Sequence, residues 1–426
     1  MKIGCICPNL PGHINPMTGL ARHLQERGHE VVFLYSSSAN GLPCIPGDKH
    51  DDMNANRPEI SKLEGNEALA LYCSIAAKET EAIFKSLPRL LDKTGVEALL
   101  LDPIQFFVEL AAMKSRIPYI TVANALYIDF SGYTPAGIFG WPHETTPEAL
   151  TRNLEAITQA VRFCYNEGTK SYAKELGFKT DLDHPSWLFS ELAYITQLPK
   201  EFDFEHPLLP PQFHYTGPFR DAKGRPNVDF PWDRLTGEPL IYVSMGTVMN
   251  GRADVFRMIA AGVAKRKETQ LVLSIGDRLN PKEIGPVPSN AIVVNHAPQL
   301  ELLKRSSVCI THAGLNTVLE SLAEGVPQLA IPVTFEQPGI AARIAAKKTG
   351  VTLSFADLTS ERVSTLLDEV LNSSTYRENA RKFQKIIGQR NGLSMAADIV
   401  EQAFGAITKS TDAYADEAGR GHESPA

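Results

Sequence analysis

The sequence predicts an α/β protein built from two doubly wound domains, each with a parallel sheet between layers of helices. A chain of 426 residues is too long for one hydrophobic core and fits two domains of about 200 residues each. In both halves, short apolar runs alternate with amphipathic segments, which is the pattern of βαβ units. Residues 219–238, rich in proline, glycine and charge, are predicted to link the halves.

The first domain, residues 1–218, opens with a predicted βαβ unit. Lys2 to Cys7 is expected to be a strand, Ile14 or Asn15 to Arg27 a helix, and Glu30 to Ser36 a second strand. The unit carries no G-x-G-x-x-G fingerprint, which argues against a dinucleotide site. The later elements predicted in this domain are helices at 67–91, 104–114 and 146–176 and strands at 97–101, 117–124 and 192–197.

The second domain, residues 239–388, repeats the alternation. Its predicted strands lie at 239–245, 271–275, 291–294, 307–311 and 328–333, and its predicted helices start at 315, 360 and 375. Residues 389–405 are expected to contain one more amphipathic helix. Residues 406–426 turn polar and rich in Gly, Glu and Ser, and they are predicted to be disordered.

A candidate general base lies at the end of the first strand. Pro11-Gly12-His13 places His13 in a loop just ahead of a helix N-terminus, which disfavours imidazolium and keeps the ring neutral. Asp102 ends the strand 97–101 and would accept the second imidazole N–H if the two strands are neighbours. The alternative is structural: a hydrogen-bonded loop histidine, and an aspartate that caps the helix at 104–114.

The turn after the strand 307–311 is a candidate phosphate site. Ligands of open α/β sheets bind at the carboxyl ends of strands, facing the next helix. There Gly314 allows close approach to the backbone, and His312, Asn316 and Thr317 add donors to the free amides of the helix. Glu320 lies one turn beyond Asn316, where it could hold a ribose diol. The spacing of these residues fits a nucleotide that lies along the helix.

The strand 239–245 ends in a similar turn. Ser244, Gly246 and Thr247 offer hydroxyls and a glycine at a strand-to-helix junction, which can hold a phosphate. Taken alone, this is common turn chemistry.

The segment from Asn295 to Gln337 resembles the donor-binding signature box of the UDP-dependent glycosyltransferase superfamily. The box appears in order as Pro298-Gln299, His312 to Glu320, Gly325 to Pro327 and Glu336-Gln337. The resemblance implies the GT-B fold, two Rossmann-like domains facing across a cleft, with the acceptor in the first domain and the donor in the second. It also implies a last helix that crosses back to the first domain.

The same resemblance implies roles for single residues. His312, Asn316 and Thr317 would hold the diphosphate, Glu320 the ribose, Gln299 the uracil edge, and Glu336 and Gln337 the sugar. The donor site expected in full comprises Ser244, Gly246, Thr247, His296, Ala297, Gln299, His312, Gly314, Leu315, Asn316, Thr317, Glu320, Glu336 and Gln337. The chain departs from the family at His296, where Trp is usual, and at Glu336, where Asp is commoner. The superfamily also pairs a histidine after its first strand with an aspartate after a later one, as His13 and Asp102 do.

Two further stretches resemble the bacterial carotenoid (zeaxanthin) glucosyltransferases. They are VANAL at 122–126 and FEQPGIAARI at 335–344. Between them, a Gly/Pro-rich loop holds five aromatic side chains that are either the wall of a flat, apolar acceptor site or ordinary loop-anchoring core: Tyr127, Phe130, Tyr133, Phe139 and Trp141.

Composition excludes several classes of partner. A net charge of −7 without a basic stripe argues against nucleic acid as a partner.

Six cysteines show neither metal-ligand spacing nor a disulfide framework, which favours a reducing cytoplasm. No apolar run is long enough to span a bilayer, although peripheral membrane contact stays open. No Asp-x-Asp pair stands in a donor position, and the run His50-Asp51-Asp52 is expected to be solvated surface, so no metal or other cofactor is expected.

These inferences predict an inverting, metal-independent O-glycosyltransferase. It would move a hexose, with glucose as the first candidate, from a UDP-sugar to a hydroxyl of a carotenoid, polyphenol, macrolide or sterol. His13 would act as the base, and Asp102 would stabilise the imidazolium. Two rivals remain: a UDP-sugar epimerase, which needs no acceptor, and a non-catalytic protein that binds lipophilic molecules on the same fold.

Overall fold

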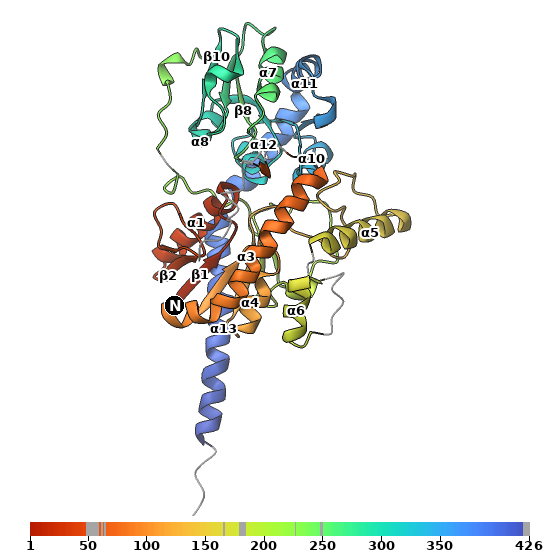
Figure 1. Cartoon of the computed structure of the whole chain (residues 1–426). Coiled ribbons are helices and arrows are strands. Elements are labelled where there is room, and N and C mark those ends of the chain that lie inside the picture. Colours follow the sequence, from red (N-terminus) through yellow and green to blue (C-terminus); the bar gives the residue numbers. More distant parts are fainter. Residues whose placement is uncertain are drawn as a thin grey trace, which may run out of the picture.

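A computed structural model shows two α/β lobes, one above the other (Figure 1). The structure describes residues 1–47, 59–60, 63, 65–164, 167–178, 185–225, 227–247 and 250–420. The run His50-Asp51-Asp52 lies outside these residues. The predicted fold class is confirmed, because each lobe is organised around one parallel sheet.

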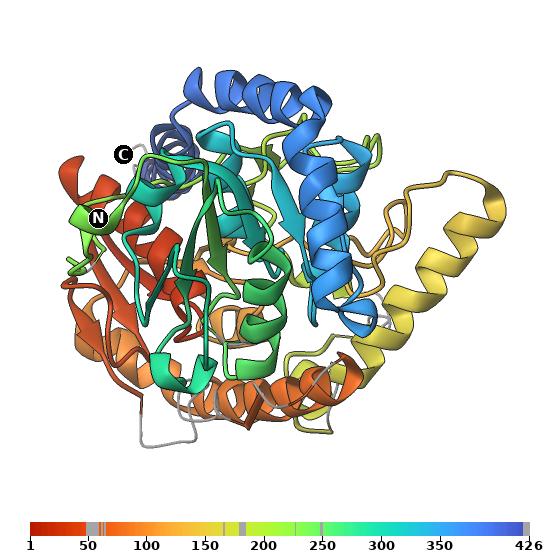
Figure 2. The ribbon, with the colours of Figure 1, turned by 90° about the horizontal axis from the view of Figure 1, so that it is seen from above.

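The N-terminal lobe has a seven-stranded sheet in the order β3-β2-β1-β4-β5-β6-β7. Its strands are β1 (Lys2–Ile6), β2 (Glu30–Leu34), β3 (Cys44–Ile45), β4 (Ala98–Leu101), β5 (Tyr119–Ala123), β6 (Tyr194–Thr196) and β7 (Phe213–Tyr215). Its helices are α1 (Pro11–Glu26), α3 (Gly65–Thr94), α4 (Val108–Lys114), α5 (Pro147–Cys164) and α6 (Glu167–Glu175). Seen from above, α5 extends away from the body of the molecule (Figure 2).

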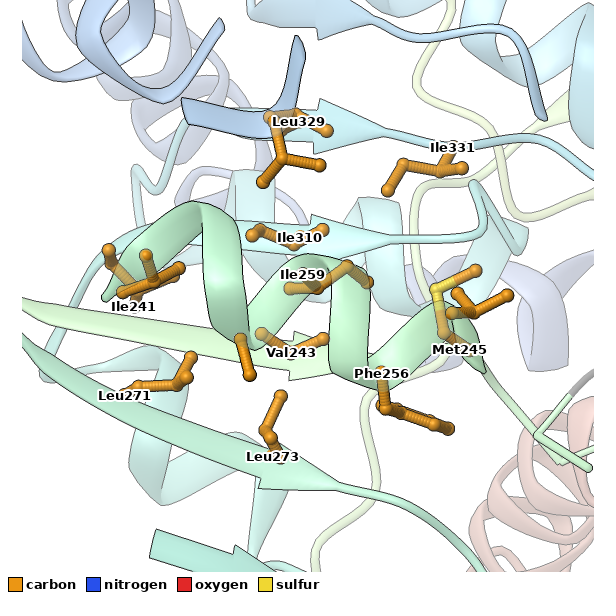
Figure 3. Packing of buried hydrophobic residues seen from close by; sticks show 14 of the residues in the cluster. Ile241, Val243, Met245, Phe256, Ile259, Leu271, Leu273, Ile310, Leu329 and Ile331 are labelled. Atoms are coloured by element: carbon orange, nitrogen blue, oxygen red, sulfur yellow. The ribbon is translucent and has the colours of Figure 1, made fainter. Parts of the chain in front are cut away.

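The C-terminal lobe has a six-stranded sheet in the order β10-β9-β8-β11-β12-β13. Its strands are β8 (Leu240–Ser244), β9 (Gln270–Ser274), β10 (Ala291–Val294), β11 (Ser306–Thr311), β12 (Gln328–Ala330) and β13 (Gly350–Thr352). Its helices are α7 (Ala253–Val263), α8 (Gln299–Leu303), α9 (Leu315–Ala323), α10 (Gln337–Ala346), α11 (Ser360–Asn372) and α12 (Ser374–Gly388). Phe256 and Ile259 of α7 pack over Val243 of the central strand β8, which explains why the side chains on this face of the sheet are apolar (Figure 3).

Both sheets reverse their strand order beside the first strand of the lobe. In the N-terminal lobe, β2 and β4 flank β1, and in the C-terminal lobe, β9 and β11 flank β8. Helices that leave to opposite faces open a crevice at such a switch point, at the carboxyl ends of the strands. His13 and Asp102 follow β1 and β4, while Gly246 and His312 follow β8 and β11. The polar residues singled out in the sequence therefore lie at the two switch points.

Helix α13 (Gly392–Arg420) returns to the N-terminal lobe. Ala396, Val400 and Phe404 are buried in the same cluster as Leu20 and Leu24 of α1. The helix continues past residue 405, where a disordered tail was expected, and runs to Arg420 (Figure 1). Residues 406–420 contain no proline and several alanines, so their composition permits a helix. Residues 421–426 lie outside the described part.

Several boundaries differ from the predicted ones for local reasons. Helix α1 begins at Pro11, because proline fits the first helical turn. Helix α4 begins at Val108, four residues later than expected, because Phe107 takes a left-handed conformation with φ of 66°. The short strands β7 and β13 and the helices α7, α8 and α10 were not predicted, because tertiary pairing, and not a long periodic pattern, defines them.

A buried ion pair joins the lobes. The Nε atom of Arg343 on α10 donates to Oδ1 of Asp203, which follows β6, at 2.8 Å, and both side chains are almost fully buried. Tyr215 donates to the other carboxylate oxygen at 2.6 Å, and the guanidinium lies 4.4 Å over the ring of Phe204. Around this pair, apolar residues of both lobes form a single cluster that includes Phe202 and Ile344. The two lobes are thus joined by one continuous buried contact.

Removal of Arg343 is expected to cost far more stability than removal of a comparable exposed arginine. Arg343→Met should lower the free energy of unfolding by about 3–5 kcal/mol, because Asp203 would be left charged and buried without its cation. The matched control is Arg390→Met, which removes a partly exposed pair with Glu201 across the same junction and should cost about 0–1 kcal/mol. Urea unfolding followed by both circular dichroism and tryptophan fluorescence measures the difference. Equal losses in the two variants would contradict the argument.

Candidate active site

One cavity of about 1230 Å³ lies between the lobes. His13, Asn124 and Tyr127 of the N-terminal lobe line it together with His312 and Glu320 of the C-terminal lobe. The expectation that both strand-end sites open into one shared space is therefore met. The N-terminal wall is predominantly apolar, and the C-terminal wall carries polar side chains and glycines.

His13 and Asp102 form a hydrogen-bonded pair at the N-terminal switch point. Nδ1 of His13 lies 2.7 Å from Oδ2 of Asp102, a fully buried carboxylate. Asn124 donates to the same oxygen at 2.8 Å, and the backbone N–H of Ile104 donates to Oδ1 at 3.0 Å. Asp102 thus anchors the next turn as well as the imidazole, but it does not cap α4, which begins at Val108 without a side-chain cap. Because Nδ1 is engaged, Nε2 is the nitrogen left for a ligand.

The setting of His13 differs from the predicted one. It lies in the first turn of α1 and not in a loop, and its pKa is raised above the ordinary value of 6.5, whereas a helix N-terminus alone was expected to keep the ring neutral. Burial, the largest influence, lowers the pKa. The carboxylate of Asp102, through its charge and its hydrogen bond, and the carboxylate of Glu336 together outweigh burial. Carboxylates from two other elements therefore decide the protonation of this histidine.

His312 lies in the opposite environment. Burial lowers its pKa to about 4, so the ring is neutral near pH 7. The ring lies against Gly314 and Gly246, and a Cβ atom added at Gly314 would lie 2.6 Å from Cε1 and Nε2 of His312. Gly246 has φ of 73°, and its backbone N–H donates to Oγ of Ser244 at 3.4 Å. Two glycines from neighbouring strand ends thus make the space that this imidazole fills.

The start of α9 is tied to the other lobe. Nδ2 of Asn316 donates to the backbone carbonyl of Gly12 at 2.6 Å. Gly12 immediately precedes His13, so this bond fixes the distance between the start of α9 and the candidate base. Thr317 and Thr247 line the cavity beside Asn316, while Leu315 is buried in the cluster that joins the lobes.

Glu320 is already paired in this structure. Gln299 donates to its Oε2 at 2.6 Å, and Arg225 of the linker forms an ion pair with its Oε1. Tyr242 in turn donates to Oε1 of Gln299 at 3.0 Å. Arg225 was missed in the sequence, because an arginine in a polar linker carries no periodic or motif signal.

The remaining predicted donor residues divide into groups. Glu336 lines the cavity, and burial raises the pKa of its carboxyl group. Gln337 uses its Oε1 to accept the backbone N–H groups of Val333 and Thr334, at 2.9 and 3.1 Å, and so also holds its own loop. His296 pairs with Asp277 on the exposed rim, and Ala297 packs beside it in the cavity wall.

The aromatic residues proposed for the acceptor split in two. Tyr127 and Phe130 line the cavity, whereas Tyr133, Phe139 and Trp141 do not. Phe139 and Trp141 stack on each other with ring centroids 4.4 Å apart, whereas their loop neighbour Ile138 lines the cavity. Apolar residues from other segments also line the wall: Ile60, Leu69, Tyr72, Ile104, Phe106, Phe107, Ile157, Val161, Leu188, Phe189 and Phe335.

The described part of the chain lacks two further features. None of its helices is long and apolar enough to cross a membrane. Its His, Cys, Asp and Glu side chains form no group of three or more placed to hold a metal ion.

Comparison with known proteins decides the family. Residues 68–391, more than half of the chain, match the family model described as UDP-glucoronosyl and UDP-glucosyl transferase. The chain belongs to this family. It is a glycosyltransferase, and the expected enzyme class is confirmed.

Related sequences cover nearly the whole glycosyltransferase. It is 26% identical over 412 residues to the zeaxanthin glucosyltransferase of Pantoea ananas, covering 94% of this chain and 95% of that protein. It is 32% identical over 420 residues to YojK, an uncharacterized UDP-glucosyltransferase of Bacillus subtilis (strain 168), covering 94% and 97%.

Solved structures share its fold. The calicheamicin glycosyltransferase CalG4 matches with a TM-score of 0.72 at 21% identity, over 95% of this chain and 98% of that chain. The spinosyn rhamnosyltransferase SpnG complexed with thymidine diphosphate matches with a TM-score of 0.66 at 17% identity, over 94% and 100%. The predicted GT-B architecture is thereby confirmed.

Gly314→Ala is expected to weaken binding of UDP. The new methyl group would displace the ring of His312, and such overpacking costs about 1–3 kcal/mol. Since φ of Gly314 is −65°, backbone strain does not contribute. Isothermal titration calorimetry with UDP should show a dissociation constant raised about tenfold or more. Gly388→Ala, with no atom near its new methyl group, is the control and should bind UDP as the wild type does. Unchanged affinity in Gly314→Ala would contradict the tight fit.

Proposed function

We propose that this glycosyltransferase moves a hexose, with glucose first among the candidates, from UDP to a hydroxyl group of a lipophilic small molecule, with inversion at the anomeric carbon. The observation that carries the proposal is the shared cavity. It brings the His13–Asp102 pair and an apolar wall face to face with a polar site at the start of α9.

His13 is the proposed general base. Asp102 fixes Nδ1 at 2.7 Å, so Nε2 accepts the proton of the acceptor hydroxyl as its oxygen attacks the anomeric carbon. The imidazolium that forms is stabilised by the buried carboxylate, which Asn124 and Ile104 hold in place. The oxygen attacks from the side opposite to the departing UDP, so an α-linked donor yields a β-glycoside.

The C-terminal lobe is proposed to receive the charge of the leaving UDP. Leu315, Asn316 and Thr317 of the first turn of α9 line the cavity, so the free N–H groups of this turn can bind phosphate oxygens. The neutral His312 can donate one further hydrogen bond. At the end of β8, Gly246 allows a phosphate to approach the backbone closely, and Thr247 adds a hydroxyl group. We propose that these groups suffice and that no metal ion is required.

The apolar wall favours a lipophilic acceptor. Side chains such as Tyr72, Phe107 and Phe189 offer burial and ring contacts but few hydrogen bonds, which suits a flat or extended hydrocarbon skeleton. Two relatives carry the names zeaxanthin glucosyltransferase and demethyllactenocin mycarosyltransferase. These names support a carotenoid or another natural product as the acceptor of this chain.

Product analysis tests the proposal as a whole. The protein is incubated with UDP-glucose and a panel of carotenoid, polyphenol, macrolide and sterol alcohols, and products are identified by mass spectrometry. A mass gain of one hexose is expected, with a β-anomeric signal by NMR. Turnover of UDP-glucose in the absence of any acceptor would instead support an epimerase. Binding of an acceptor without any transfer would support a carrier protein.

The pH dependence of transfer should report His13. Because only the neutral ring accepts a proton, kcat/KM is expected to rise with pH through a value above 6.5. Asp102→Asn removes the charge that raises this pKa, so the acid limb should move to lower pH while the plateau falls by about 10²–10⁴-fold. His13→Ala should lower the plateau by a similar factor. Glu201→Gln, which alters an exposed carboxylate remote from the site, should leave the profile unchanged. Transfer by His13→Ala at the wild-type rate would refute the assignment of the base.

A further inference from the structure

The ribose-binding role expected of Glu320 meets an obstacle in the structure. Both carboxylate oxygens already have partners, Gln299 on one and Arg225 on the other. Glu320 is buried, whereas Arg225 keeps about a quarter of its side chain exposed and lines the cavity. A ribose diol that uses both oxygens therefore competes with the arginine for Glu320. A partly buried cation released in this way is stabilised by another anion.

The linker holds Arg225 at this place from several sides. Arg22 donates to Asp221 at 2.7 Å, Lys223 donates to Glu26 at 2.7 Å, and Arg220 pairs with Glu324 at the end of α9. Two of these pairs bind the linker to α1 and one binds it to the end of α9, so the linker contacts both lobes. Within it, Ala222, Arg225 and Asn227 face the cavity. Arg225 is therefore a fixed part of the donor wall.

The charges that line the cavity single out this arginine. Among the described lining residues, the permanently charged cations are Arg225 and Arg343, and Arg343 is committed to the buried pair with Asp203. The carboxyl groups are more numerous: Glu109, Asp129, Asp277, Glu301, Glu320 and Glu336. A diphosphate carries negative charge into this surrounding, where each uncompensated carboxylate repels it. The guanidinium of Arg225 is the cation that can offset it.

The hydrogen bonds of Arg225 leave room for a second partner. Its contact with Glu320 is made through one terminal nitrogen, and its Nε atom is buried without a hydrogen-bond partner. A guanidinium can present two parallel N–H groups to a phosphate, which is a stronger arrangement than a single bond.

We propose that Arg225 is a donor-binding residue that pairs with Glu320 before the nucleotide binds and transfers to the diphosphate when the ribose engages Glu320. After the exchange the guanidinium is paired with the diphosphate, and the Glu320 carboxylate accepts hydrogen bonds from the ribose hydroxyls and from Gln299. The exchange also makes the linker a sensor of a complete donor: a nucleoside without phosphates competes with the arginine but offers it no anion. This inference rests on the proposed function only in taking a uridine diphosphate as the ligand.

The test compares UDP with uridine, because the two ligands differ only in the phosphates. Isothermal titration calorimetry is run on the full chain and on Arg225→Gln, Arg225→Lys and the control Arg390→Gln. Arg390→Gln removes an arginine that is paired with Glu201, but Arg390 lies outside the linker and does not line the cavity. Thermal melts of all variants confirm folding, and Arg225→Lys retains the charge if the glutamine variant is poorly folded.

The expected result is a selective loss. Arg225→Gln should weaken UDP by about tenfold or more, because a charge-assisted hydrogen bond to the diphosphate is lost. The same variant should not weaken uridine, because uridine has no phosphate to pair with Arg225. Arg225→Lys should recover part of the affinity for UDP, and Arg390→Gln should match the wild type. Raising the salt concentration should weaken UDP binding more in the wild type than in Arg225→Gln.

Two outcomes would overturn the proposal. Equal losses for UDP and uridine would mean that Arg225 only orients Glu320. Tighter uridine binding with unchanged UDP binding would mean that Arg225 merely blocks the carboxylate. Both readouts are binding constants that involve no acceptor. Failure of this inference is therefore distinguishable from failure of the proposed sugar transfer, which would show as the absence of a glycoside product.

Discussion

The approach of the two sheets, carboxyl ends toward one cavity, is the constraint on which the rest of this glycosyltransferase depends. Each sheet alone offers a crevice at its switch point, but neither crevice contains both a base and a phosphate site. The buried Arg343–Asp203 pair and the apolar cluster around it fix the relative placement of the lobes. The bond from Asn316 to the carbonyl of Gly12 carries that placement to the reacting groups, because Gly12 is adjacent to His13.

The two histidines of the cavity show how environment assigns chemical roles. Both are buried, and burial lowers the pKa of both. At His312 little opposes burial, and the ring stays neutral beside two glycines. At His13 the carboxylates of Asp102 and Glu336 outweigh the effect of burial and raise the pKa of the ring. In the proposed reaction, a proton released by the acceptor is therefore stabilised at His13 and not at His312.

The linker belongs to the site as well as to the architecture. Arg225 reaches Glu320 because Arg220, Asp221 and Lys223 bind the segment to both lobes. An apolar linker could join the lobes equally well but would leave Glu320 without its cation. The charges of this segment are thus explained by what they face and not by solubility alone.

The sequence by itself determined the fold class, the strand ends that carry function and the family. These properties are local: a buried parallel strand is an apolar run, a strand-to-helix turn needs glycine, and the signature box is contiguous from Asn295 to Gln337. The tertiary structure decided the rest, including the separation of Tyr127 and Phe130 from Tyr133, Phe139 and Trp141, the pairing of Arg225 with Glu320, and the protonation of His13. Each of these depends on contacts between residues far apart in the chain. Periodicity and spacing describe only neighbours along a segment, so they carry no information about which distant charge or aromatic ring the fold brings alongside.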